Sequence, residues 1–142
     1  MTNYENYELK CKIITENNNH YIQQFKEYLT LQGLSKKTIC RHCNNVEFYL
    51  NTFSLREDAN DYNFGCTSYA LNDFFGYFFI RKCMWSTPNT IKSTAASFKK
   101  FYAFMLSKKY ITKEQYEELT STIKDNMFFW QEECEDFNNP VY

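Results

Sequence analysis

Glycine and proline are scarce in this chain of 142 residues, which contains only three glycines and two prolines. Tight turns between β-strands rely heavily on these two residues, so a fold of many short strands is not expected and helices are favoured. Aromatic residues make up 20% of the chain, which excludes a disordered composition. At this length we expect one domain with a substantial buried core.

Long apolar segments are also missing. No stretch approaches the roughly 18 consecutive apolar residues that a membrane span needs, and residues 1–19 lack the continuous apolar run of a secretory signal. We therefore expect a cytoplasmic protein without a membrane partner. Its six cysteines should then be reduced and mostly buried, rather than paired in disulfides.

Residue patterns typical of catalysis are absent from the sequence. There are only two histidines, and no glycine-rich phosphate loop, Gly-x-Ser-x-Gly or His-Glu-x-x-His motif occurs. Cys40-x-x-Cys43 beside His42 could be half of a zinc site, but no second pair supplies the remaining ligands. We expect no enzyme activity, cofactor, metal or small-molecule substrate, and we interpret Cys43 as a core residue and Cys40 as a surface or boundary residue.

Charge is distributed very unevenly along the chain. Residues 74–113 contain eight lysines or arginines and no carboxylate, whereas residues 114–142 contain eight carboxylates and a single lysine. A basic segment of this kind is typical of a nucleic-acid surface. The alternative is ordinary solubilising charge that the acidic segment neutralises by folding back. A related hypothesis is that the acidic segment shields a binding surface.

Hydrophobic periodicity predicts the first two helices. Apolar residues recurring every three to four positions predict a helix from about Asn19 to Gln32, which stops at Gly33. A second helix is expected to begin behind Ser35, a favoured N-cap. Its apolar stripe consists of Ile39, Cys43, Val46, Leu50 and Phe53. Residues 54–71 mix acidic residues, asparagine and glycine without a sustained period, so a loop is expected there.

Three further helices are predicted after this loop. Asn72 is expected to cap a very apolar third helix, inside which Gly76 allows another backbone segment to pack closely. Thr87 and Pro88 start a fourth helix, and Thr112 with Gln115 starts a fifth through a capping box. The apolar stripe of the fourth helix is Ile91, Ala95, Phe98, Tyr102 and Met105. If the fifth helix is needed for folding, its core residues are expected to be Tyr116, Leu119, Ile123 and Phe128.

Polar residues gather on the outer faces of the second and fourth helices. At 100° per residue, Lys37, Arg41 and Asn44 lie within about 40° of one another, opposite the apolar stripe. The fourth helix has an equivalent outer face, formed by Asn89, Ser93, Ala96 and Lys100, with Lys99 at its flank. The amides and the positive dipole at both helix N-termini also suit phosphate contacts.

The segments "FKEYLTLQGLSKKTICRHCNNVEFYL" and "TPNTIKSTAASFKKFYAFMLSKKYI" resemble the N-terminal SAM-like core-binding domain of tyrosine recombinases, the phage integrase family. The resemblance covers roughly residues 21–111. The matching residues are Phe25, Tyr28, Leu29, Gly33, Leu34, Ser35, Thr38 and Ile39, followed by Thr87, Pro88, Thr90, Ile91, Phe98, Phe101, Tyr102 and Tyr110. The family's catalytic domain has no counterpart in this chain.

The resemblance implies an all-α, SAM-like bundle of four to five helices over residues 19–111, preceded by an arm (1–18) and followed by an acidic helical extension (112–142). It further implies weak, salt-dependent binding of duplex DNA, accessory to site-specific recombination or DNA integration. The expected contacts are Lys36, Lys37, Arg41, Asn44, Asn89, Thr90, Lys92, Ser93, Lys99 and Lys100. A recombinase catalytic subunit is a further expected partner. The alternative function is a helical protein-interaction module, which could associate with itself.

Overall fold

The fold was obtained as a computed structural model, which describes residues 2–140. This part of the chain is helical and contains no β-strand, which confirms the all-α prediction. The chain forms two compact units, Met1–Gly65 and Cys66–Tyr142. A short 3₁₀ turn, η2 (Phe64–Cys66), lies at the boundary between them.

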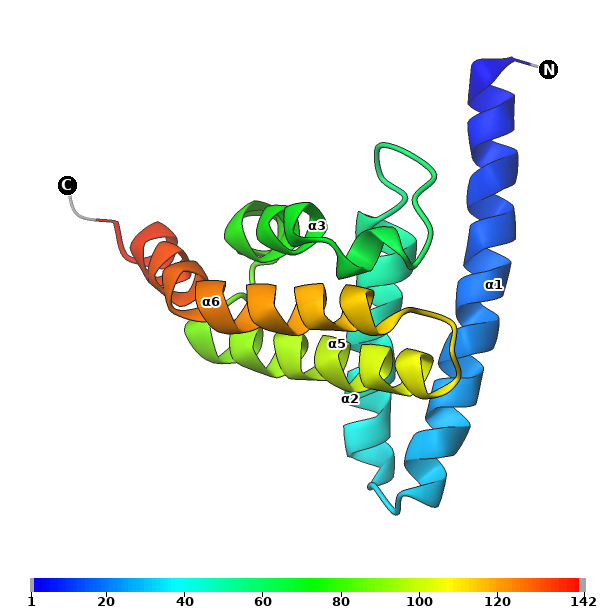
Figure 1. Cartoon of the computed structure of the whole chain (residues 1–142). Helices are drawn as coiled ribbons and strands as arrows, with labels where there is room; N and C mark the ends of the chain where they lie inside the picture. The colour runs from blue at the N-terminus through cyan, green and yellow to red at the C-terminus, as the bar shows by residue number, and fades with distance from the viewer. Residues whose placement is uncertain (1, 141–142) are drawn as a thin grey trace. The chain divides into compact units, whose positions relative to one another are not determined.

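The first unit is built on two long helices (Figure 1). Helix α1 (Asn3–Leu31) is followed by α2 (Lys36–Glu47), which continues directly into a π-helical segment, η1 (Phe48–Phe53). Gly33 ends the first helix with a φ of +83°, which a glycine adopts without strain. The Leu34 amide donates to the Leu29 carbonyl at 3.3 Å. The predicted stop at Gly33 is therefore confirmed.

Helix α1 begins at Asn3, and the predicted start near Asn19 is wrong. Thr2 caps it by accepting from the Glu5 amide at 3.1 Å. Asn18 is only 1% exposed and donates to the Asn51 side chain at 2.9 Å. A buried polar group is tolerated when it is hydrogen-bonded. The helix therefore runs through this position without interruption.

The second unit begins with a continuous helical stretch made of α3 (Ser68–Asp73), the π-helical segment η3 (Phe74–Phe78) and α4 (Phe79–Lys82). Helices α5 (Pro88–Ser107) and α6 (Lys113–Asn138) follow and lie side by side (Figure 1). The α3 helix starts behind Thr67, whose hydroxyl accepts from the Ala70 amide at 3.1 Å. The predicted cap at Asn72 is therefore wrong, and the predicted loop, expected to run to residue 71, ends before the helix begins at Ser68.

The π-helical segment η3 explains an unusual run of buried aromatic residues. The Phe79 amide bonds to the Phe74 carbonyl five residues earlier, whereas an α-helix bonds four residues back. Residues five apart consequently share a face, so Phe74 and Phe79 are both buried, as are Phe75 and Ile80. One short segment thereby supplies two adjacent rows of side chains to the core.

Helix α6 is an integral part of the second unit. Trp130 is fully buried, stacks on Phe75 with ring centroids 4.9 Å apart and donates from Nε1 to the Asn72 side chain at 3.0 Å. A Cβ added to Gly76 would lie 3.5 Å from the Trp130 ring, an ordinary van der Waals distance to a side chain, so the close approach of another backbone expected at this glycine is not what the structure shows. The segment expected as an extension, 112–142, therefore contributes to a core.

Burial along α6 follows one edge of the helix. Leu119 and Ile123 are buried as expected, and Trp130 and Cys134 continue the same edge. Tyr116 is half-buried. Phe128 is 76% exposed, so its expected place in the core is wrong. At 100° per residue it lies on the opposite side of the helix from Leu119.

The two aromatic residues Phe128 and Trp130 provide a test of this packing. Trp130→Ala should lower the free energy of unfolding by about 3–5 kcal/mol, because it leaves a cavity against Phe75. Phe128→Ala, only two residues away, should change it by less than about 0.5 kcal/mol. Urea unfolding followed by far-UV circular dichroism measures both. Equal losses for the two variants would contradict the described orientation of α6.

Candidate nucleic-acid interface

The start of helix α5 is fixed by its own residues. Thr87 accepts from the Thr90 amide at 3.1 Å, and its own amide donates to the Thr90 hydroxyl at 2.7 Å. Pro88 occupies the first helical position, where its missing amide hydrogen costs nothing. All five residues of the predicted apolar stripe, Ile91, Ala95, Phe98, Tyr102 and Met105, are buried. The predicted register of this helix is confirmed.

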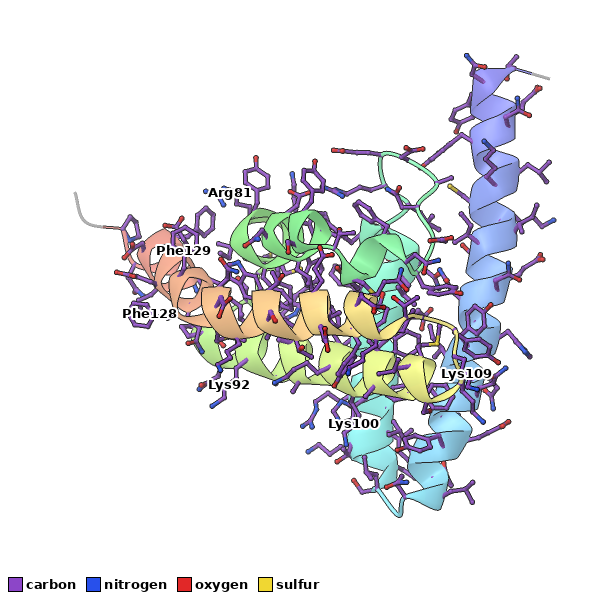
Figure 2. The ribbon with its side chains drawn as sticks, in the orientation of Figure 1. Arg81, Lys92, Lys100, Lys109, Phe128 and Phe129 are labelled. Carbon is purple, nitrogen blue, oxygen red and sulfur yellow. The ribbon has the colours of Figure 1, made fainter. Side chains whose placement is uncertain are left out.

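The outer face of α5 carries lysines and small residues. We define the lysine stripe as the exposed residues Asn89, Lys92, Ala96, Lys99, Lys100 and Ala103. Figure 2 shows Lys92 and Lys100 extending from α5 on the side away from α6. Within residues 2–140, none of the three lysines forms an ion pair. The stripe therefore presents cations that no carboxylate of the described chain neutralises directly.

Two residues predicted to contact DNA have structural roles in α5. The Thr90 hydroxyl takes part in the capping box and also donates to the Thr87 carbonyl at 3.0 Å. The half-buried Ser93 donates its hydroxyl to the Thr90 carbonyl at 3.2 Å. Since both hydroxyl groups are occupied by the helix backbone, we leave these two residues out of the proposed contact set.

Helix α2 carries the second group of predicted contacts, in the other unit. Lys36, Lys37, Arg41 and Asn44 are all exposed. Ile39 and Val46 form the buried side of the helix, and Ser35 caps it by accepting from the Thr38 amide at 3.2 Å. The predicted outer face of this helix is therefore present. The two groups of cations belong to different units, so each is treated as a separate surface.

The acidic residues of α6 do not cover the lysine stripe. The edge of α6 that faces the start of α5 is marked by Gln131, which donates to the Pro88 carbonyl at 3.0 Å. Lys113 and Lys124 lie within about 20° of Gln131 around the helix axis and Glu117 and Glu135 within about 40°, whereas the other six carboxylates lie about 100–160° away. The ion pairs in the described part of the chain include Arg56–Glu57 and Lys113–Glu117, at 4.0 and 3.9 Å.

The placement of the α6 carboxylates relative to the lysine stripe bears on the hypothesis that the acidic segment shields a binding surface. Lys113–Glu117 is a pair within α6 itself, and surface pairs of this kind contribute little to stability. Of the eight cations of residues 74–113, Lys113 pairs with Glu117 of the acidic segment, whereas the three lysines of the lysine stripe form no ion pair within residues 2–140. Removing residues 114–142 would instead remove Trp130 and its neighbours from the core, so this deletion would not expose an otherwise intact surface.

The cysteine pair of α2 borders a groove in the first unit. The groove has a volume of about 580 Å³ and is lined by Lys26, Thr30, Leu34, Lys36, Ile39, Cys40, Cys43 and Asn44. Burial is the main cause of the raised pKa of Cys43, which keeps this thiol protonated at neutral pH. In residues 2–140 no three His, Cys, Asp or Glu side chains are grouped as metal ligands would be, and none of the six cysteines, all within these residues, forms a disulfide.

Several exposed aromatic residues of the second unit were not predicted. Phe128 and Phe129 project from α6 (Figure 2), with exposed fractions of 76% and 55%. The Arg81 guanidinium lies over the Tyr77 ring at 4.4 Å. Spacing did contain a signal for Phe128, which stands seven residues from both Ser121 and Glu135 on the polar side of α6. The apolar character of phenylalanine outweighed that signal in the prediction.

Comparison with known proteins gives no assignment. No protein-family model, curated protein or solved structure significantly matches this chain. Within residues 2–140 no helix is long and apolar enough to cross a membrane. The resemblance to the recombinase core-binding domain therefore stays a prediction from the quoted motifs.

The cysteines allow a test of thiol reactivity. Burial raises the pKa of Cys83 to about 11, and only the thiolate reacts rapidly with alkylating reagents. In the native protein the exposed Cys40 should be alkylated first, and Cys83 should remain protected at neutral pH. Peptide mapping by mass spectrometry measures each site, with protein in denaturant as the control. Modification of Cys83 as fast as Cys40 in the native protein would contradict this.

Proposed function

We propose that the chain binds duplex DNA weakly, through phosphate contacts made by the lysine stripe of α5 and by the outer face of α2. It would act as a non-catalytic relative of the recombinase core-binding domain, accessory to recombination or DNA integration. A catalytic recombinase subunit would supply the chemistry, because the motifs of the family's catalytic domain do not occur in this sequence.

The observation that carries this proposal is the lysine stripe itself. Three lysines without ion-pair partners in the described chain stand along one exposed face, and Ala96 and Ala103 lie between them. Alanine side chains leave room for a phosphate backbone to approach, and lysine acts as a flexible point charge toward phosphate. No carboxylate interrupts residues 74–113, so the local field along α5 favours an anion.

The proposed contacts predict modest affinity. Each neutralised phosphate releases counterions, so the logarithm of the binding constant falls with the logarithm of salt concentration by about 0.9 per contact. With Lys37, Arg41, Lys99 and Lys100 as the main contacts, the slope should be roughly −3 to −4. Contacts of this kind carry little sequence information, so binding should be similar for unrelated duplexes.

Replacing Lys99 and Lys100 together by alanine tests the α5 surface. The double variant should bind duplex DNA more weakly, and its salt slope should be shallower by about 2, because two phosphate contacts are lost. Fluorescence anisotropy with a labelled duplex at several salt concentrations measures both quantities. Alanine is a better helix former than lysine, so helicity by circular dichroism should be unchanged.

A matched control is available on α1. Lys10→Ala with Lys12→Ala removes the same charge from exposed helical positions, so it should leave the slope nearly unchanged. Equal effects of the two double variants would show that only net charge matters. Wild-type affinity and slope in the Lys99/Lys100 variant would refute the proposed surface.

The α2 surface requires its own measurement, because it belongs to the other unit. Lys37→Ala with Arg41→Ala should also reduce the slope by about 2. Combined with the α5 substitutions, the two losses in binding free energy should add if the two surfaces share no partners and act independently. An α2 double variant that binds like the wild type would restrict the DNA surface to α5.

A further inference from the structure

The outer side of helix α6 combines carboxylates with one large apolar side chain. We define the acidic stripe as the exposed residues Glu117, Ser121, Asp125, Phe128, Glu132 and Glu135, which are spaced three or four positions apart. They follow one side of the helix, opposite the buried edge that contains Leu119 and Trp130. Phe128 is 76% exposed at the middle of this stripe. The duplex-DNA proposal assigns it no role.

The acidic stripe and the lysine stripe match each other in spacing. Ser121, Phe128 and Glu135 recur every seven residues, as do Asn89, Ala96 and Ala103. When two helices pack side by side, residues seven apart return to the same seam, and a large side chain inserts among smaller ones. Phe128 can therefore lie against the alanines of the lysine stripe, with Ser121 about two turns before it and Glu135 about two turns after it.

The stripes also match in charge. Lys92, Lys99 and Lys100 flank the alanines of α5. On α6, Asp125 and Glu132 flank Phe128 on one side, and the exposed Lys124 lies about 40° from Phe128 on its other side. None of these six charged residues forms an ion pair within residues 2–140. Opposite charges on either side of an apolar seam determine which helices pair and in what register.

The two stripes do not meet within one chain. Helices α5 and α6 pack against each other with their apolar sides, and the lysine stripe and the acidic stripe are the exposed sides that remain. Figure 2 likewise shows Lys92 and Lys100 directed away from α6. A partner that presents a lysine stripe to Phe128 must therefore come from another molecule, and every further copy of this chain carries one.

We propose that the acidic stripe of one copy docks on the lysine stripe of a second copy, with Phe128 as the central apolar contact. One helix pair buries less than the roughly 1,200–2,000 Å² of a stable complex, so association is weak and concentration-dependent. Salt screens the flanking ion pairs and lowers affinity further. Each contact uses different surfaces on the two molecules, so assembly extends unless a two-fold arrangement closes it.

Self-association and DNA binding would use the same lysines. If the proposed function is correct, duplex DNA competes with the acidic stripe of a second copy, and free protein is held in a state that must dissociate before it binds DNA. This competition alone rests on the DNA proposal. The self-association itself stands on the two stripes.

Sedimentation velocity of the full chain at low salt, over a range of protein concentrations, tests the proposal. The wild type should show a rising mean mass, and Phe128→Ser should raise the dissociation constant at least tenfold. Tyr69→Ser is the matched control, because Tyr69 is a 72% exposed aromatic residue on α3, outside both stripes; it should associate like the wild type. Circular dichroism checks that each variant is folded.

Complementation distinguishes stripe pairing from general stickiness. One variant carries Lys92→Gln with Lys99→Gln, and the other carries Asp125→Asn, Phe128→Ser and Glu132→Gln. Each alone should be monomeric, whereas an equimolar mixture should form a dimer through the two intact stripes and nothing larger. A wild type that stays monomeric, a Phe128→Ser variant that associates normally, or a folded mixture that remains monomeric would each overturn the proposal.

Adding unlabelled duplex DNA separates this proposal from the proposed function. Dissociation of the wild-type assembly as DNA binds supports both. Self-association in a protein that does not bind DNA supports the stripe pairing and refutes the DNA proposal. DNA binding by a protein that is monomeric at every concentration refutes the stripe pairing alone.

Discussion

The burial of Trp130 is the interaction on which the arrangement of the second unit depends. Its ring stacks on Phe75 and lies against Gly76, and its indole nitrogen is bonded to Asn72. A fully buried tryptophan makes a large apolar contribution, and its polar atom must still find a partner. Both requirements are met by the same short stretch of α3 and η3. This fixes the rotation of α6 about its own axis, and with it the direction of every other side chain on that helix.

The rotation of α6 has a direct electrostatic consequence. Because its apolar edge faces the core, most of its carboxylates lie away from the edge that faces α5, where Gln131 contacts the Pro88 carbonyl. The lysines of α5 thus keep their field even though the chain as a whole carries a formal net charge of −1. Net charge describes the long-range behaviour of a molecule, whereas recognition depends on the local distribution. The second unit is accordingly a dipolar body with separate basic and acidic helical faces.

Helical periodicity predicted α5 well, but it placed the start of the regular helix α1 near Asn19 instead of Asn3 and did not foresee the π-helical segments. For α5 the cap, the buried stripe and the exposed lysines all follow from 100° per residue, because that helix is a regular α-helix from Pro88 to Ser107. The π-helical segment η3 has a different period, so the rule of 100° per residue did not predict that Phe75 and Ile80 are buried on the same face. Asn18 and Asn72 are placed by Asn51 and Trp130, partners distant in sequence. The position of Phe128 likewise depends on which edge of α6 faces the core, and that edge is set by contacts of α6 with α3 and η3.

Helix α6 keeps the residues that hold the fold and the residues that face solvent on separate, interleaved rows. Phe128 and Trp130 are two positions apart in the sequence, yet Phe128 is exposed and Trp130 is fully buried. Most substitutions at the buried positions of this helix should therefore destabilise the fold, whereas most substitutions at its exposed positions should be tolerated. The exposed residues of α6 can therefore change during evolution, one at a time, while the protein stays folded.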